Sequence, residues 1–187
     1  MELNNILSCK NSEEFREWLE IHHKTEKECY IQCKRGKITS DDVFYYIDAV
    51  YVALSFGWID STVRKKDGIP LQRFSPRRKN SNWTELNKER CRWLIKNNLM
   101  TSSGFKTLPD LEEKFQYDKE IIEIIKKDKD IYNNFNNFPD LYKRIKLGNI
   151  QKEKKNIEVF NRMLNNFLKK TKENKLYGDW NDNGRLI

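Results

Sequence analysis

The chain has 187 residues, which is long enough for one domain with a hydrophobic core and short for two. Aromatic residues make up 12% of it and argue against a disordered chain, although 34% of the residues are charged and the net charge is +8. No apolar run approaches the roughly 20 residues that span a bilayer, and no signal peptide is recognisable at the start, so we expect a cytoplasmic protein.

The four cysteines, Cys9, Cys29, Cys33 and Cys91, form no CxxC pair. Without an export signal they are expected to stay reduced. Cys29 and Cys33 would share one face of a strand, too far apart along it for an easy disulfide. We expect buried thiols here rather than metal ligands or nucleophiles.

In chain order, apolar residues at helical spacing first predict a helix over residues 13–22, capped by Asn11 or Ser12. The alternating segment CYIQCKRGK then predicts a strand near residues 28–35. Ser40 is expected to cap a second helix, because two aspartates follow it where the helix dipole favours acids.

Two further strands, near residues 58–64 and 69–75, are predicted on either side of an Asp-Gly turn signal. They would form an antiparallel hairpin with Arg64 and Arg73 near its two ends. The sequence therefore predicts a sheet of three strands in the first half of the chain.

Helical patterns dominate the rest of the chain. One helix is predicted over residues 83–97, capped by Ser81 or Asn82. The longest helix is predicted over residues 151–175, with one apolar stripe and several lysine-rich faces.

These elements predict an α+β fold, in which a small antiparallel sheet of about three strands packs on helices. We expect a single domain over residues 1–187, with an α+β part over 1–100 and a mostly helical part over 101–187. Two aromatic residues near the end, Tyr177 and Trp180, are expected to pack back onto the body of the protein.

Basic residues concentrate in segment 61–100, where eleven lysines and arginines stand against three acidic residues. Four arginines in this segment, with a tryptophan at a predicted helix start, are candidates for binding an anionic small molecule or a partner protein. The planar guanidinium suits phosphate or carboxylate, and a helix start offers free backbone donors to an anion. The alternatives are a solvated basic surface, or pairing of these arginines with the acidic block 41–60. The candidates are Arg64, Arg73, Arg77, Arg78 and Trp83.

Trp58 and Asp60 form a second suggestive pair, because a strand would place a ring and a carboxylate on one face. This arrangement would suit an enzyme of unknown chemistry with a site near Trp58, Asp60 and Arg73. We favour the alternative, in which Asp60 pairs with Arg73 or Arg77 and fixes the register of the hairpin.

No catalytic residue, metal ligand or cofactor is assigned, and a binding protein is favoured over an enzyme. Only His22 and His23 offer an imidazole base, and both fall in a helix that looks like core. Adjacent helical residues point about 100° apart, so the two rarely share a metal ion. The sequence also lacks a glycine-rich phosphate loop and a dinucleotide fingerprint.

Four sequence blocks resemble the bacterial YdeI/OmpD-associated proteins, also called bacteriocin-protection proteins. The blocks, in chain order, are FGWIDS (56–61), QRFSPRR (72–78), SNWTELNKER (81–90) and FNNFPDLYKRI (135–145). The resemblance covers roughly residues 12–187 and implies a role in tolerance of bacteriocins or cationic antimicrobial peptides, without an agreed activity. Some members carry a thymidylate synthase label. We reject it here, because no cysteine of this chain follows a proline as in the Pro-Cys-His motif of those enzymes.

The sequence thus favours a protein that binds an anionic ligand or partner through a basic, aromatic-rich surface. Nucleic-acid binding is the alternative, from the net positive charge and the interleaved aromatics, although no recognised nucleic-acid motif is present. No prediction of oligomeric state follows.

Overall fold

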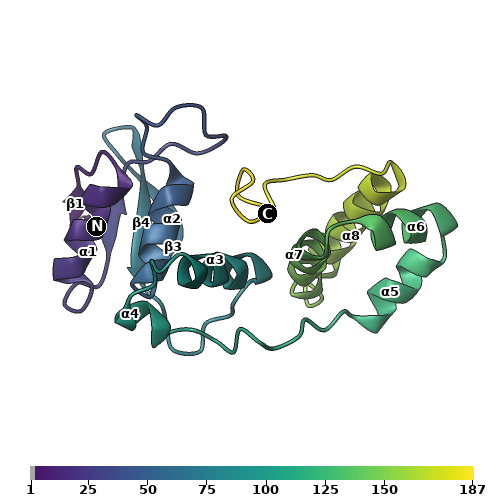
Figure 1. The fold of residues 1–187 in the computed structure, drawn as a ribbon. Helices are drawn as coiled ribbons and strands as arrows, with labels where there is room; N and C mark the ends of the chain where they lie inside the picture. Colours follow the sequence, from purple (N-terminus) through teal and green to yellow (C-terminus); the bar gives the residue numbers. More distant parts are fainter. Residues whose placement is uncertain (1–2) are drawn as a thin grey trace. The chain divides into compact units, whose positions relative to one another are not determined.

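A computed structural model describes residues 3–187, and its strands all lie in the first half of the chain (Figure 1). The strands are β1 (Ile6–Leu7), β2 (Cys29–Ile31), β3 (Trp58–Lys66) and β4 (Ile69–Pro76). The helices are α1 (Ser12–His22), α2 (Tyr46–Ser55), α3 (Glu85–Lys96), α4 (Ser102–Phe105), α5 (Lys119–Lys126), α6 (Lys129–Asn137), α7 (Asp140–Gln151) and α8 (Ile157–Lys172). The predicted α+β fold is confirmed.

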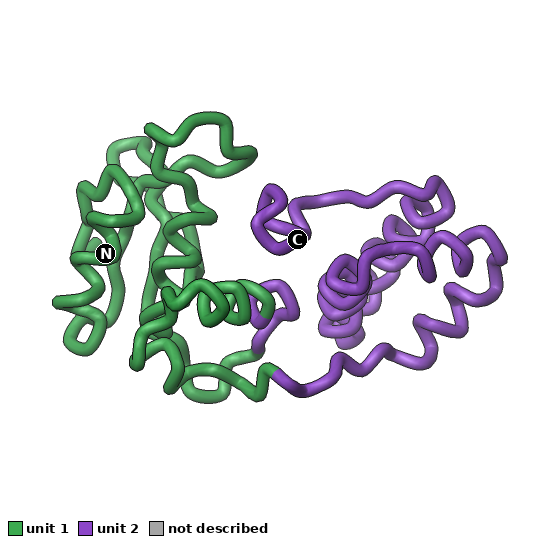
Figure 2. Tube along the Cα trace, viewed as in Figure 1, with its two compact units in different colours: residues 1–82, 89–111 green, residues 83–88, 112–187 purple. Residues whose placement is uncertain are grey.

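The chain divides into two compact units (Figure 2). Unit 1 comprises Met1–Asn82 and Glu89–Leu111, and unit 2 comprises Trp83–Lys88 and Glu112–Ile187. Helix α3 therefore begins in unit 2 and continues in unit 1.

Every helix within residues 3–187 is too short or too polar to cross a lipid bilayer.

The sheet of unit 1 has the order β1-β2-β4-β3. Its three longer strands are antiparallel neighbours, as predicted, and the short β1 adds a fourth strand that pairs in parallel with β2. Asp67 and Gly68 form the turn between β3 and β4, with φ of 51° and 80°. Positive φ at both central residues is the geometry of a type I′ hairpin, which explains the Asp-Gly signal.

Helices α1 and α2 pack on one face of this sheet and on each other. The ring of Phe15 in α1 lies 6.5 Å from that of Phe44 and 5.3 Å from that of Phe74. Phe74 lies opposite Cys29 in β2 and opposite Asp60 in β3, so these three side chains share the helix-covered face. Residues at the intervening positions belong to the other face of the sheet.

Helix α2 begins at Tyr46, later in the chain than the predicted cap at Ser40. Tyr45, directly before it, is extended and pairs with Lys34, because the Lys34 N–H donates to the Phe44 carbonyl (2.9 Å) and the Lys34 carbonyl accepts from Tyr46 N–H (2.8 Å). Ser40 instead accepts a hydrogen bond from the N–H of Asp42 in a turn. Long-range backbone pairing thus overrides the local helix-start signal.

Helix α3 also has a different cap from the predicted Ser81 or Asn82. The side chain of Thr84 accepts from the N–H of Asn87 at 3.2 Å. Ser81 belongs to the turn before it, where its N–H donates to the Arg78 carbonyl.

Unit 2 has a hydrophobic core of its own, built from α5 to α8. Tyr142 stands at its centre, and the rings of Tyr177 and Trp180 lie 6.2 and 5.6 Å from the Tyr142 ring, which confirms that the end of the chain packs back onto the body. The buried members of this core are Ile121, Ile125, Ile131, Phe135, Phe138, Tyr142, Leu147, Ile150, Leu164 and Phe167.

The long helix predicted over residues 151–175 is wrong in one respect, because the segment contains a break. Helix α7 ends at Gln151, and α8 starts after Asn156, whose side chain accepts from the N–H of Val159. The Asn156 N–H also closes a turn onto the Glu153 carbonyl at 2.7 Å. Asn156 therefore caps the start of α8, and a turn separates α8 from the end of α7.

Candidate functional site

One face of the unit 1 sheet carries a pocket of about 630 Å³, which we call the sheet-face pocket. Tyr30 and Arg73 lie directly opposite each other in β2 and β4, so their side chains stand on the same face. Arg64 of β3 lies opposite Leu71, two positions from Arg73, and therefore joins this face. The residues around the pocket are Leu3, Glu28, Tyr30, Thr62, Arg64, Lys65 and Arg73.

The Arg73 guanidinium is held in a fixed orientation. Its Nε donates to Oε2 of Glu28 at 2.7 Å, and its Nη1 donates to Oγ of Ser61 at 3.0 Å. The hydrogen bond to Glu28 is the main reason that the pKa of Arg73 is raised. Because both side chains keep more than a quarter of their surface exposed, we expect the ion pair to contribute orientation more than stability.

Arg64 and Lys65 bring further positive charge to the same pocket, and both are exposed. Among residues 3–187, no carboxylate lies within ion-pair distance of either cation. Three cations therefore face one carboxylate around the sheet-face pocket, and that carboxylate is already bonded to Arg73. Such a site has an excess of donors for an oxyanion.

The other predicted arginines lie elsewhere. Arg77 is half-buried, its Nη2 donates to the carbonyl of Asn82 at 2.7 Å, and burial lowers its pKa. Arg78 is exposed and lines a separate small pocket formed by residues 78–82. Trp83 belongs to unit 2. The structure thus brings together two of the four arginines predicted to act as one group, Arg64 and Arg73.

Trp58 and Asp60 share a strand face, but both are engaged in packing. Trp58 is 1% exposed and its indole N–H donates to the His23 carbonyl at 3.2 Å. Asp60 accepts a hydrogen bond from the hydroxyl of Tyr46 at 2.6 Å. The predicted pairing of Asp60 with Arg73 or Arg77 is therefore replaced by a bond to Tyr46. Burial and this hydrogen bond raise the pKa of Tyr46. Neither Trp58 nor Asp60 lines the sheet-face pocket.

The cysteine thiols are held neutral. Burial raises the pKa of Cys33 to about 11 and that of Cys91 to about 12, and it also raises those of Cys9 and Cys29. A thiol becomes a strong nucleophile or metal ligand as the thiolate, which these environments disfavour. Within residues 3–187, no cluster of three or more His, Cys, Asp or Glu side chains is placed to hold a metal ion.

Sequence reasoning missed five of the residues that line the pocket: Leu3, Glu28, Tyr30, Thr62 and Lys65. The alternating pattern around Tyr30 predicted its strand but not which strand would lie beside it. Glu28 precedes that strand and gives no local sign of contact with Arg73, which lies 45 positions later. Only the pairing of β2 with β4 brings these groups together.

Residues 7–107, more than half of the chain and most of unit 1, match the model of a family described as a domain of unknown function (DUF8412). No curated protein and no solved structure matches the chain.

Proposed function

The chain belongs to the family of the domain of unknown function DUF8412, and on that premise we propose that its sheet unit binds a small anionic ligand in the sheet-face pocket. One observation carries this proposal. Arg64, Lys65 and Arg73 surround a single pocket, and their only carboxylate neighbour in its lining is Glu28, which is bonded to Arg73.

Each group has a distinct part in the proposed site. Glu28 and Ser61 occupy Nε and Nη1 of Arg73 and so aim the rest of its fork. Arg64 supplies a second guanidinium and Lys65 a point charge, while the hydroxyl of Thr62 adds a neutral donor. This set suits a compound with phosphate or carboxylate groups, because planar N–H pairs match the spacing of two oxyanion oxygens.

The resemblance to YdeI/OmpD-associated proteins, with its implied role in bacteriocin or antimicrobial-peptide tolerance, stays a prediction. The match to DUF8412 does not bear on it. A cationic protein repels cationic peptides, which argues against direct capture of such a peptide at this surface.

The test is calorimetric titration of the full chain with inorganic pyrophosphate and with ATP at low ionic strength. We expect Arg64→Ala to weaken binding about tenfold or more, since a charge-assisted hydrogen bond contributes about 1.5–3 kcal/mol. The melting temperature should stay near that of the wild type, because the Arg64 side chain is exposed. Arg78→Ala is the matched control and should bind as the wild type does, because it removes an exposed arginine outside the pocket.

Equal loss of affinity in Arg64→Ala and Arg78→Ala would overturn the proposal, because it would mean that binding follows total charge. Titration with duplex DNA tests the alternative function, nucleic-acid binding. If DNA binds and its affinity falls steeply with salt while pyrophosphate and ATP do not bind, the exposed basic hairpin serves a polyanion instead.

A further inference from the structure

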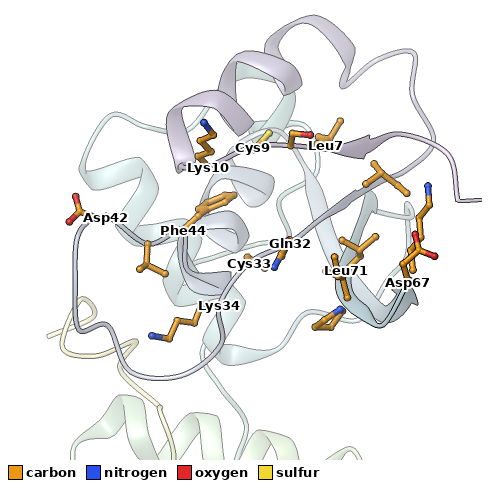
Figure 3. A pocket seen from close by; sticks show the side chains of 16 residues that line it. Leu7, Cys9, Lys10, Gln32, Cys33, Lys34, Asp42, Phe44, Asp67 and Leu71 are labelled. Atoms are coloured by element: carbon orange, nitrogen blue, oxygen red, sulfur yellow. The ribbon is translucent and has the colours of Figure 1, made fainter.

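A second and larger pocket, of about 850 Å³, lies where β1 and β2 end and β4 begins (Figure 3). We call it the sheet-end pocket. It shares no lining residue with the sheet-face pocket. Four segments converge on it: residues 6–10, residues 32–34, residues 42–44 and the hairpin residues 66–67 and 69–71.

Two buried apolar side chains line this pocket. Phe44 and Leu71 are 7% and 5% exposed, and Figure 3 shows Leu71 on the hairpin beside Asp67, with Cys33 and Gln32 between it and Phe44. Phe44 is held in place by the backbone hydrogen bond from Lys34 N–H to its carbonyl. Ile69 adds a side chain that is 44% exposed at the hairpin end.

The two thiols in the lining do not add charge. Burial raises the pKa of Cys33 to about 11, and it raises that of Cys9 as well. Both are therefore neutral at physiological pH and add weakly polar surface to the lining.

The rim is cationic. Lys10, Lys34 and Lys66 are exposed, and in the described part of the chain no carboxylate is within ion-pair distance of their ammonium groups. Two aspartates also line the pocket, Asp42 and Asp67, and Figure 3 shows them on opposite sides of the view, with Phe44 and Leu71 between them. Three cations against two separated anions leave a net positive rim around an apolar floor.

We propose that the sheet-end pocket binds an amphipathic carboxylate, a molecule with an apolar chain or ring and one anionic head. The body would lie on Phe44, Leu71 and Ile69, and the head would meet the lysine rim. The volume falls within the roughly 300–1,000 Å³ of small-molecule sites, which combine an apolar lining with a few polar groups that orient the ligand. This site is independent of the one proposed on the sheet face.

The test compares three probes that share one ten-carbon chain: decanoate, decanol and decyltrimethylammonium, each below its micelle concentration. Calorimetry on the full chain should show saturable binding of decanoate, weaker binding of decanol and none of the cation. The double variant Lys34→Gln/Lys66→Gln should weaken the binding of decanoate at least about fivefold and leave the affinity for decanol unchanged. Two lysines are changed together because one exposed charge pair contributes little by itself. Ile69→Gln, at a half-exposed position, should weaken both.

The matched control is Lys37→Gln, which removes an exposed lysine of the same loop that does not line the pocket. Saturating pyrophosphate should leave the affinity for decanoate unchanged, so failure of one site is distinguishable from failure of the other. Equal affinity for all three probes, or equal loss in Lys37→Gln and the double variant, would overturn the proposal.

Discussion

Lys146 of unit 2 illustrates how a single charge can be placed among rings. Its ammonium lies 3.9 Å from the centre of the Tyr177 ring and 5.5 Å from that of Tyr142. Burial lowers its pKa to about 8, from an ordinary value near 10.5. Between these two values, the unfolded chain binds more protons at this residue than the folded chain does.

We therefore expect the free energy of unfolding to rise with pH between about 8 and 9.5, because deprotonation relieves the cost of a buried charge. Thermal unfolding followed across this range should show the rise in the wild type and lose it in Lys146→Met. The matched control, Lys143→Met on the same helix, should keep it. A wild-type profile that is flat or falls with pH would contradict the assignment.

At the scale of elements, the contact of α2 with α4 depends on the smallest side chain. The Thr101 N–H and hydroxyl both donate to the carbonyl of Ser55, at 3.1 and 2.6 Å, and bring the start of α4 against the end of α2. A methyl group built on Gly104 would overlap that same carbonyl oxygen and the sulfur of Met100. Gly104 is therefore required by close approach rather than by its backbone angles.

Gly104→Ala should lower the free energy of unfolding by about 1–3 kcal/mol, the usual cost of overpacking a site whose neighbour is backbone. Urea denaturation of the full chain measures this loss. Ser102→Ala, an exposed change within the same helix, should lie within about 0.5 kcal/mol of the wild type. Comparable losses in the two variants would mean that the cost reflects helix α4 itself and not its approach to α2.

At the scale of the whole molecule, each compact unit has buried side chains of its own. Phe74 is fully buried against Phe15 in unit 1, and Phe167 is fully buried between Phe135 and Tyr142 in unit 2. Since each core is assembled from one unit's elements, a cavity in one core should first loosen the amides of that unit.

Phe167→Ala should lower the free energy of unfolding by about 3–5 kcal/mol, as truncation of a buried phenylalanine usually does. Native-state hydrogen exchange should then accelerate in α6 to α8 and leave α1, α2 and β4 close to the wild type. Phe74→Ala is the reciprocal variant and should reverse the pattern. Equal acceleration of both units in either variant would show that the chain opens as one cooperative body.

The sequence alone determined the features that rest on local rules. The Asp-Gly pair predicted the hairpin of β3 and β4, alternation predicted the strand of β2, and Asn11 was one of the two residues predicted to cap α1. The start of α2 and the break before α8 were mispredicted, because backbone pairing with Lys34 and the cap at Asn156 outweighed the apolar periodicity.

Only the tertiary structure decided which charges meet. The six arginines and lysines from Arg64 to Arg78 look alike in sequence, yet Arg64 and Arg73 join one pocket while Arg77 is turned toward the Asn82 carbonyl. The physical reason is that strand register fixes the face on which a side chain stands, and register depends on contacts between residues far apart in the chain, such as Glu28 with Arg73.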